Sequence, residues 1–341
     1  MHTIRVTEPR ELLAFVPYQL GFQPTDSLVV MSLRGERSRV GLIARVDLAH
    51  AADAAAGLAR HVLDDGATSA VVVVYTESDH GAHDAAQAAA AALTDAGLPV
   101  RSWWVTGGDY RPMLPEFPEA TPPVGRPISD LQATEVAATM VAQGLRALPT
   151  RSDLDLTPAS ARERRRAASA RALECDGGAE DRPAWRAASL RQWLDAASAD
   201  TFTAADAGRL AAALDDRVVR DAVLCALVPG GRKVAEQVIS GQRGSDALGE
   251  VVTSVIETPG VMPDADVFAP VVAVLTHVAA HVDSAPARTL LAFLAWWQGD
   301  GARAQVHLSA AERHDPDYRL AALLTSVLAA AMPPGWIRAH R

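Results

Sequence analysis

Apolar and polar residues follow two different patterns along the chain, and the pattern changes after residue 106. The segments Leu28–Leu33 and Arg39–Leu48 are apolar runs separated by a short polar turn containing glycine, which is typical of a β-hairpin. Val71–Tyr75 is apolar on both faces and predicts a buried parallel strand. Leu98–Val105 predicts another strand. The other elements expected in this half are a short strand at Met1–Val6 and helices at Glu8–Val16, Ala51–Asp65 and Ala82–Ala96.

These elements predict an α/β domain over residues 1–106. Its mixed sheet would begin with the β-hairpin and continue with strand–helix alternation, which places helices on the faces of the sheet. Residues 107–128 are rich in proline and glycine and cannot form regular helix or a central strand, so we expect a proline-rich connector. Residues 129–157 would form a linking helix, capped by Ser129 or Asp130 and ending near Gln143, followed by a loop.

Residues 158–341 show helical periodicity without a convincing strand, and Gly, Pro, Asp or Ser separates the segments. We therefore expect an all-α C-terminal domain. The helices predicted there are Ala159–Leu173, Ala184–Ala197, Ala204–Leu214, Arg217–Leu227, Lys233–Ile239, Ala247–Ile256, Val267–His281, Ala287–Trp297, Ala302–Arg313 and Tyr318–Ala330.

The end of this half resembles a tetratricopeptide unit. Small and apolar residues stand at the spacings of the second helix of such a unit: Gly299, Ala304, Leu308, Ala311 and Pro316. The first helix departs from the motif, because Arg288 and Ala292 occupy its aromatic and glycine positions. A tetratricopeptide-like helical hairpin is the expectation, and an ordinary antiparallel helix pair is the alternative.

Composition narrows the range of functions. The 341-residue chain carries a formal net charge of −9, whereas general nucleic-acid binding needs a positive field, so nucleic acid is not an expected partner. No apolar run is long enough to cross a bilayer, and the N-terminus lacks the order of a signal peptide, so we expect a cytoplasmic protein without membrane contact. Cys175 and Cys225 show no spacing motif and are expected to be thiols.

Four polar residues form the candidate binding site. Arg45 and Asp47 are two residues apart on the second hairpin strand and so share a face. Asp26 and Ser27 directly precede the first strand and follow the loop Pro17–Pro24, whose prolines and glycine specify its path. The functional interpretation is a substrate-binding corner at the edge of the sheet. The structural interpretation is an Arg–Asp pair that positions the loop.

Acids and histidines after the central strand are weaker candidates for chemistry. Asp79 and His80 could assist a divalent metal, but their spacing matches no known zinc motif. For Asp47 and Asp79, capping of the helices that follow them is the favoured interpretation, because Asp is common at this position after a strand. We therefore expect no metal site, and the residues indicate no particular cofactor.

The strongest basic run is Arg162–Arg166, with Arg171 nearby. On a helix these side chains spread around the cylinder, and Glu163 partly offsets them, so a solvated helix is expected. Nucleic-acid binding at this helix is a minor alternative.

The chain also resembles a known family over nearly its whole length. The residues that carry the resemblance are Leu20–Val30, Gly41–Leu48, Arg101–Trp104, Gly144–Arg151, Trp297–Asp300 and Asp315–Tyr318. They are similar to the actinobacterial domain-of-unknown-function family four-one-nine-two, which implies no activity. Relatives tend to have cysteines after the paired tryptophans. Val105–Pro112 has none here, so the resemblance implies no metal or redox role for this segment.

Together these observations favour a non-enzymatic cytoplasmic protein with an interaction or scaffold role. A protein is the expected partner, and a small-molecule ligand is a second option. The alternative is an enzyme or ligand sensor of unknown reaction, with its polar site at Asp26, Ser27, Arg45 and Asp47.

Overall fold

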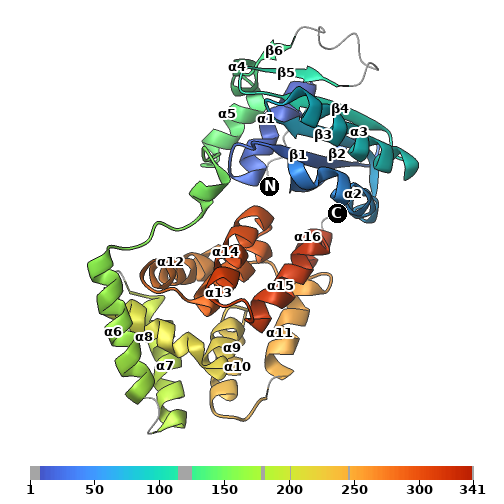
Figure 1. Ribbon diagram of the computed structural model, residues 1–341. Helices are drawn as coiled ribbons and strands as arrows, with labels where there is room; N and C mark the ends of the chain where they lie inside the picture. Colours follow the sequence, from blue (N-terminus) through green and yellow to red (C-terminus); the bar gives the residue numbers. More distant parts are fainter. Residues whose placement is uncertain (1–7, 114–124, 178–180, 200, 245, 340–341) are drawn as a thin grey trace. The chain divides into compact units, whose positions relative to one another are not determined.

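The computed structural model of this chain describes residues 8–113, 125–177, 181–199, 201–244 and 246–339 (Figure 1). The chain forms two compact units, Met1–Leu154 and Asp155–Arg341. The strand expected at Met1–Val6 lies outside the described residues. None of the described helices is both long enough and apolar enough to span a membrane.

The N-terminal unit contains a six-stranded mixed sheet with the order β2-β1-β3-β4-β5-β6. The expected hairpin is confirmed, because β1 and β2 pair antiparallel. The pair β3 and β4 is parallel, as expected for strands joined by a helix, and the remaining neighbours are antiparallel. The strands are β1 (Ser27–Arg34), β2 (Arg39–Asp47), β3 (Ala67–Tyr75), β4 (Val100–Val105), β5 (Asp109–Pro112) and β6 (Arg126–Pro127).

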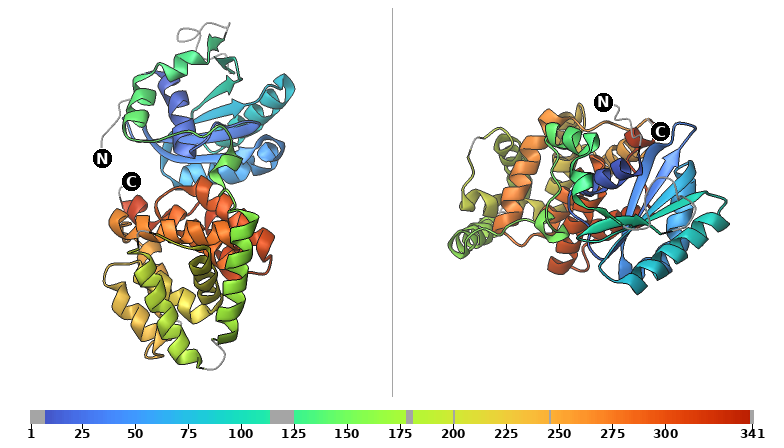
Figure 2. Two further views of the ribbon diagram at one scale, coloured as in Figure 1. Left: turned by 90° about the vertical axis from the view of Figure 1, so that its left-hand side faces the viewer. Right: turned by 90° about the horizontal axis from the view of Figure 1, so that it is seen from above.

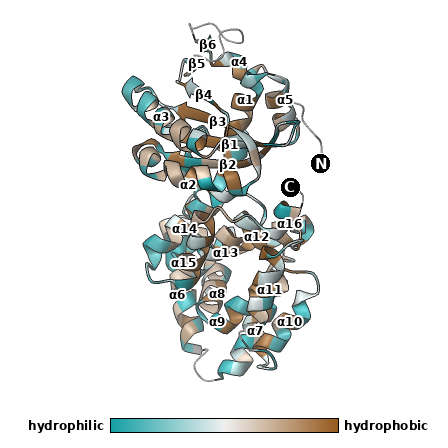
Figure 3. Ribbon diagram, turned by 90° about the vertical axis from the view of Figure 1, so that its right-hand side faces the viewer, coloured by the Kyte–Doolittle hydropathy of each residue, from teal (hydrophilic) through white to brown (hydrophobic). Residues whose placement is uncertain are grey.

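Helices cover both faces of this sheet (Figure 2). One face packs alternate residues such as Leu28, Val72 and Trp104 against α2 (Ala51–Asp64) and α3 (Asp79–Asp95). The helices α1 (Pro9–Leu20), α4 (Ser129–Gln132) and α5 (Glu135–Ala142) lie on the other side. Because both faces are covered, the central strands are mainly apolar, as in the run Val71–Val74 of β3, and Figure 3 shows much of their ribbon in brown.

The segment expected to be a connector contributes two strands at the edge of the sheet. Strand β5 pairs with β4, and the short β6 pairs with β5. Proline has no backbone N–H group. It is tolerated in an edge strand because the N–H groups on the outer side of such a strand form no hydrogen bonds to a neighbouring strand. The helix expected from Ser129 to Gln143 is interrupted. Thr134 accepts a hydrogen bond from the amide of Ala137 and so starts α5 as a new helix.

The C-terminal unit is helical, as expected, and has no strand among its described residues. Its core includes Leu210, Phe268, Leu290 and Trp297, all nearly inaccessible to solvent. Both cysteines of the chain lie in this unit as free thiols. The helices are α6 (Ala161–Gly177), α7 (Arg182–Ala196), α8 (Ala204–Asp215), α9 (Arg217–Ala226), α10 (Gly231–Ile239), α11 (Asp246–Ile256), α12 (Ala265–His281), α13 (Ala285–Trp297), α14 (Gly301–His314), α15 (Arg319–Ala329) and α16 (Gly335–Ala339).

Helices α13 and α14 form the expected hairpin near the end of this unit. They pack against each other, and their small residues Ala292, Ala304 and Ala311 are fully buried. Small side chains let two helices approach closely, which is the physical basis of the motif. That this hairpin is of the tetratricopeptide type stays a prediction.

Candidate functional site

The four residues singled out in the N-terminal unit lie at one corner of the sheet, where β1 begins and β2 ends. Ser27 and Asp47 are cross-strand partners there. The Nε atom of Arg45 donates to the Ser27 hydroxyl over 2.9 Å, and its Nη2 lies 2.6 Å from Asp47 Oδ1. Arg45 thus joins the two strands through polar contacts on one face, as the two-residue spacing predicted.

Asp26 bonds in a different direction. Its Oδ1 accepts from the hydroxyl of Thr76, which follows β3, over 2.8 Å. The carbonyl of Thr76 accepts in turn from the indole N–H of Trp104 over 2.7 Å. Sequence reasoning missed Thr76. The signal available was its position at the carboxyl end of a buried strand.

The polar atoms of this corner are largely engaged with one another. The Ser27 hydroxyl donates to the Thr25 carbonyl over 2.6 Å and accepts from Arg45, so it faces no general base. Burial lowers the pKa of Arg45, and the carboxylate of Asp47 acts against that shift. The side chain of Asp47 is 55% exposed and is the accessible member of the pair. These bonds tie the residues at the start of β1 to one another and to β2, and binding of a ligand at this corner stays a prediction.

The acids and histidines after β3 also serve local structure. Ser78, rather than Asp79, caps α3 and accepts from the amide of Gly81. Asp79 instead lies 3.2 Å from the imidazole of His83. Asp47 precedes a short 3-10 helix without making a side-chain cap. Capping by these two aspartates is therefore wrong. No metal-binding group of three or more His, Cys, Asp or Glu forms among the described residues.

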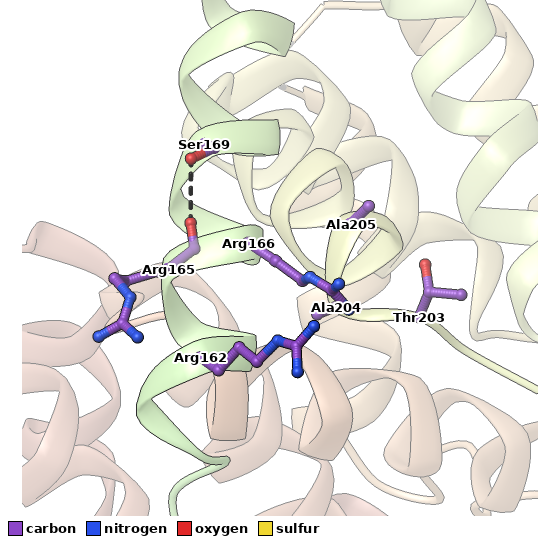
Figure 4. A pocket seen from close by; sticks show the side chains of 7 residues that line it. All are labelled: Arg162, Arg165, Arg166, Ser169, Thr203, Ala204 and Ala205. Carbon is purple, nitrogen blue, oxygen red and sulfur yellow. Dashed lines mark hydrogen bonds between the residues drawn. The ribbon is translucent and has the colours of Figure 1, made fainter.

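A second candidate site lies in the C-terminal unit, where α6 passes the start of α8. It is a cavity of about 580 Å³ lined by Arg162, Arg165, Arg166, Ser169, Thr203, Ala204 and Ala205. We call it the arginine pocket. Figure 4 shows Arg162 and Arg166 extending from α6 toward Ala204, whereas the guanidinium of Arg165 extends to the other side.

Helix geometry explains this convergence. At 3.6 residues per turn, Arg162, Arg166 and Ser169 fall within about 60° of one another around α6. The close contact between α6 and α8 also needs Gly208, since a Cβ there would collide with the backbone of Ala167. The glycine brings the first turn of α8 beside the arginines.

Several other charged groups of α6 have partners, whereas the arginines of the pocket have no ion pair among the described residues. Arg164 lies 2.7 Å from Asp283, and Arg171 lies 2.8 Å from Asp215. Glu163 accepts from Ser160 over 2.6 Å, a bond that lowers the pKa of this carboxyl group. Arg162, Arg165 and Arg166 form no ion pair with any described residue.

The start of α8 adds backbone donors. Thr203 and Asp206 form a capping box, in which the Thr203 hydroxyl accepts from the amide of Asp206 over 3.2 Å. The amides of Ala204 and Ala205 precede any carbonyl of their own helix that could accept from them. His277 holds this turn in place, because its Nε2 lies 3.2 Å from the Thr203 carbonyl, which can only accept. Burial lowers the pKa of His277 and so favours its neutral form.

The basic run spreads around α6, as expected. Arg164 and Arg171 leave α6 in other directions and pair with acids. Within the run, Arg162 and Arg166 are four residues apart and share one face, a pairing that the expectation did not include. The four-residue spacing was the signal in the sequence that could have paired these two arginines. It does not indicate that the N-terminus of another helix, α8, lies opposite them.

The comparisons with known proteins give a family without an assigned function. No curated protein and no solved structure matches the chain. A family model does match residues 9–240 and 259–335, which include both candidate sites. On that match the chain belongs to the family described as Domain of unknown function (DUF4192).

Proposed function

We propose that this protein is a non-enzymatic interaction protein whose helical unit binds a negatively charged group of its partner in the arginine pocket. The observation that carries the proposal is that Arg162 and Arg166 project into an open cavity, where no acid of the described residues forms an ion pair with them. A guanidinium fork binds carboxylate and phosphate oxygens through paired, charge-assisted hydrogen bonds.

The local electrostatics support an anion at this place. Two guanidinium groups on one helix face repel each other, and an anion between them relieves that repulsion. The positive end of the α8 dipole and the amides of Ala204 and Ala205 act in the same direction. Asp206 is the nearest acid of this turn, and its two oxygens are engaged with Thr203 and Arg209.

The polar corner of the sheet supports an enzyme or ligand sensor less well. A ligand there would have to displace the bonds that Arg45 makes with Ser27 and Asp47. The discriminating measurement is a thermal-shift screen against nucleotides, divalent metals and common metabolites. A reproducible stabilisation that disappears in Asp47→Ala would establish the corner as the ligand site, by mass action on the folded state.

The arginine pocket is tested by binding of labelled acidic peptides, carboxylate-rich and phosphorylated, followed by fluorescence anisotropy. We expect at least one class to bind the wild-type protein and to lose about tenfold or more in affinity in Arg162→Ala/Arg166→Ala. Arg191→Ala is the matched control. It removes one exposed positive charge from α7 of the same unit, at a residue that does not line the pocket.

Binding that weakens equally in the control and in the double variant would reflect the net charge of the unit and would contradict a pocket. Absence of binding by every anionic probe would overturn the proposed function. All three arginines are exposed, so the substitutions leave the core intact.

A further inference from the structure

We propose, resting on the anion-binding function above, that the arginine pocket selects a phosphate monoester carried on a polypeptide partner. The juxtaposition that points to this ligand has three parts: two guanidinium groups without an ion pair in the described part of the chain, the two first-turn amides of α8, and an exposed leucine farther along the same face of α6.

The charge and the number of donors match a phosphate group better than a carboxylate. A phosphate monoester carries close to two negative charges at neutral pH and three terminal oxygens, whereas a carboxylate carries one charge and two oxygens. Arg162 and Arg166 supply two positive charges. Their forks extend from α6, and Ala204 and Ala205, which open α8, line the pocket from a second helix. The oxygens of a tetrahedral phosphate point in several directions and can accept from both helices. The two oxygens of a carboxylate lie in one plane and suit donors from one side.

The hydroxyl groups of the pocket shape it without adding donors. The Ser169 hydroxyl donates to the carbonyl of Arg165 over 3.1 Å, and the Thr203 hydroxyl donates to Asp206 over 2.6 Å. Selectivity therefore depends on the arginines and on the backbone of α8.

The helix beyond the pocket indicates that the phosphate is attached to a longer chain. Leu173 is 74% exposed and lies four residues after Ser169, which places it on the same face of α6 as Arg162 and Arg166. An apolar side chain of a partner segment could pack there while its phosphate occupies the pocket. The volume of about 580 Å³ also exceeds the space that a single phosphate ion needs.

The same features argue against a nucleic-acid strand. A strand requires a track of positive charge for successive phosphates, but Arg164 and Arg171 are neutralised by Asp283 and Asp215. The net charge of −9 works in the same direction.

The experiment uses the full-length protein and three fluorescein-labelled degenerate peptide pools, with phosphoserine, glutamate or serine at one fixed position. We expect the phosphoserine pool to bind about tenfold or more tightly than the glutamate pool. Arg162→Ala and Arg166→Ala should each abolish this preference, and Arg191→Ala, on α7 outside the pocket, should preserve it. Arg166→Lys should weaken it, because lysine keeps the charge but lacks the fork. Leu173→Ser should lower affinity for the pool without changing its preference for phosphate.

Each other outcome overturns a defined part of the proposal. Equal binding of the glutamate and phosphoserine pools at the pocket would exclude phosphate selectivity and leave the anion-binding function standing. Inorganic phosphate that binds as tightly as the phosphoserine pool would exclude a polypeptide source. Tighter, steeply salt-dependent binding of a single-stranded RNA oligomer would replace the polypeptide by nucleic acid. Binding of no anionic probe at all would overturn both this inference and the proposed function.

Discussion

The Nη1 atom of Arg288 lies 3.2 Å from Nδ1 of His307, and both residues are buried in the helical unit. A guanidinium can only donate, so Nδ1 of His307 accepts and Nε2 carries the imidazole proton. Arg288 Nη1 also lies 2.6 Å from Asp155, which places one positive and one negative charge beside the neutral ring.

This arrangement predicts a loss of stability in mild acid. Burial, together with the nearby arginines, lowers the pKa of His307 from 6.5 to about 4. The folded state binds this proton less readily than the unfolded state. Protonation of His307 therefore costs no stability above pH 6.5, and the free energy of unfolding falls as the pH drops from 6.5 toward 4. The full effect is about 3 kcal/mol.

Denaturant unfolding at several pH values checks this prediction, with His307→Asn as the comparison. Asparagine can accept near the Nδ1 position but does not titrate. The variant should therefore lose less stability than the wild type between pH 6.5 and 4.5. Other groups titrate in both proteins, so the difference between the two curves isolates His307. Parallel curves would show that His307 does not carry the effect.

The strand residue Gly41 should tolerate no side chain. A Cβ at this position would collide with Asp65, Arg34 and Ser32, which meet beside β2 in the N-terminal unit. We expect Gly41→Ala to destabilise the unit by about 3 kcal/mol or more. Gly57→Ala is the matched control, because Gly57 lies within α2 with nothing near its Cβ position. It should stabilise by up to about 1 kcal/mol. Thermal unfolding compares the midpoints of both variants with that of the wild type. A Gly41→Ala midpoint equal to that of Gly57→Ala would contradict the predicted collision.

Asp26 combines an unusual backbone conformation with a side-chain acceptor. Its φ is 41°, and it accepts from the hydroxyl of Thr76. Asp26→Ala removes the acceptor and places an alanine in the left-handed region, which should cost about 2 kcal/mol. Asp26→Asn keeps an acceptor and tolerates this conformation, so it should stay within about 0.5 kcal/mol of wild type. Chemical denaturation compares them. A large loss in Asp26→Asn would show that the negative charge matters in its own right.

Gly208 should control the approach of α8 to α6. A Cβ there would meet the backbone of Ala167 and Arg171, which cannot move without displacing the helix. Gly208→Ala should destabilise the helical unit by about 3 kcal/mol and weaken anion binding, because the first turn of α8 moves away from Arg166. Gly249→Ala, on an open face of α11, is the control and should leave binding unchanged. Unchanged stability in Gly208→Ala would contradict the close approach.

The local elements of this protein follow from its local sequence. The hairpin of β1 and β2 was predictable because its strands are adjacent and its turn is short. The buried strand β3 was predictable because both of its faces are apolar. The helical content of residues 155–339 follows from periodicity and from the residues between the helices.

The candidate sites also combine contacts that a local pattern predicts with contacts between distant residues that it does not. The contact of Arg45 with Asp47 needed only the two-residue period of a strand, and the sequence predicted it. The bond from Thr76 to Asp26 joins residues fifty positions apart, and no local pattern encodes it.

The arginine pocket shows the same limit. The four-residue spacing of Arg162 and Arg166 puts them on one face of a helix that repeats every 3.6 residues. What lies opposite that face depends on how α8 packs against α6. Gly208 admits α8 against α6, while Asp283 and Asp215 neutralise Arg164 and Arg171. These contacts depend on packing between distant segments. The sequence therefore determined the elements, and packing decided which charges are paired and which remain free to bind.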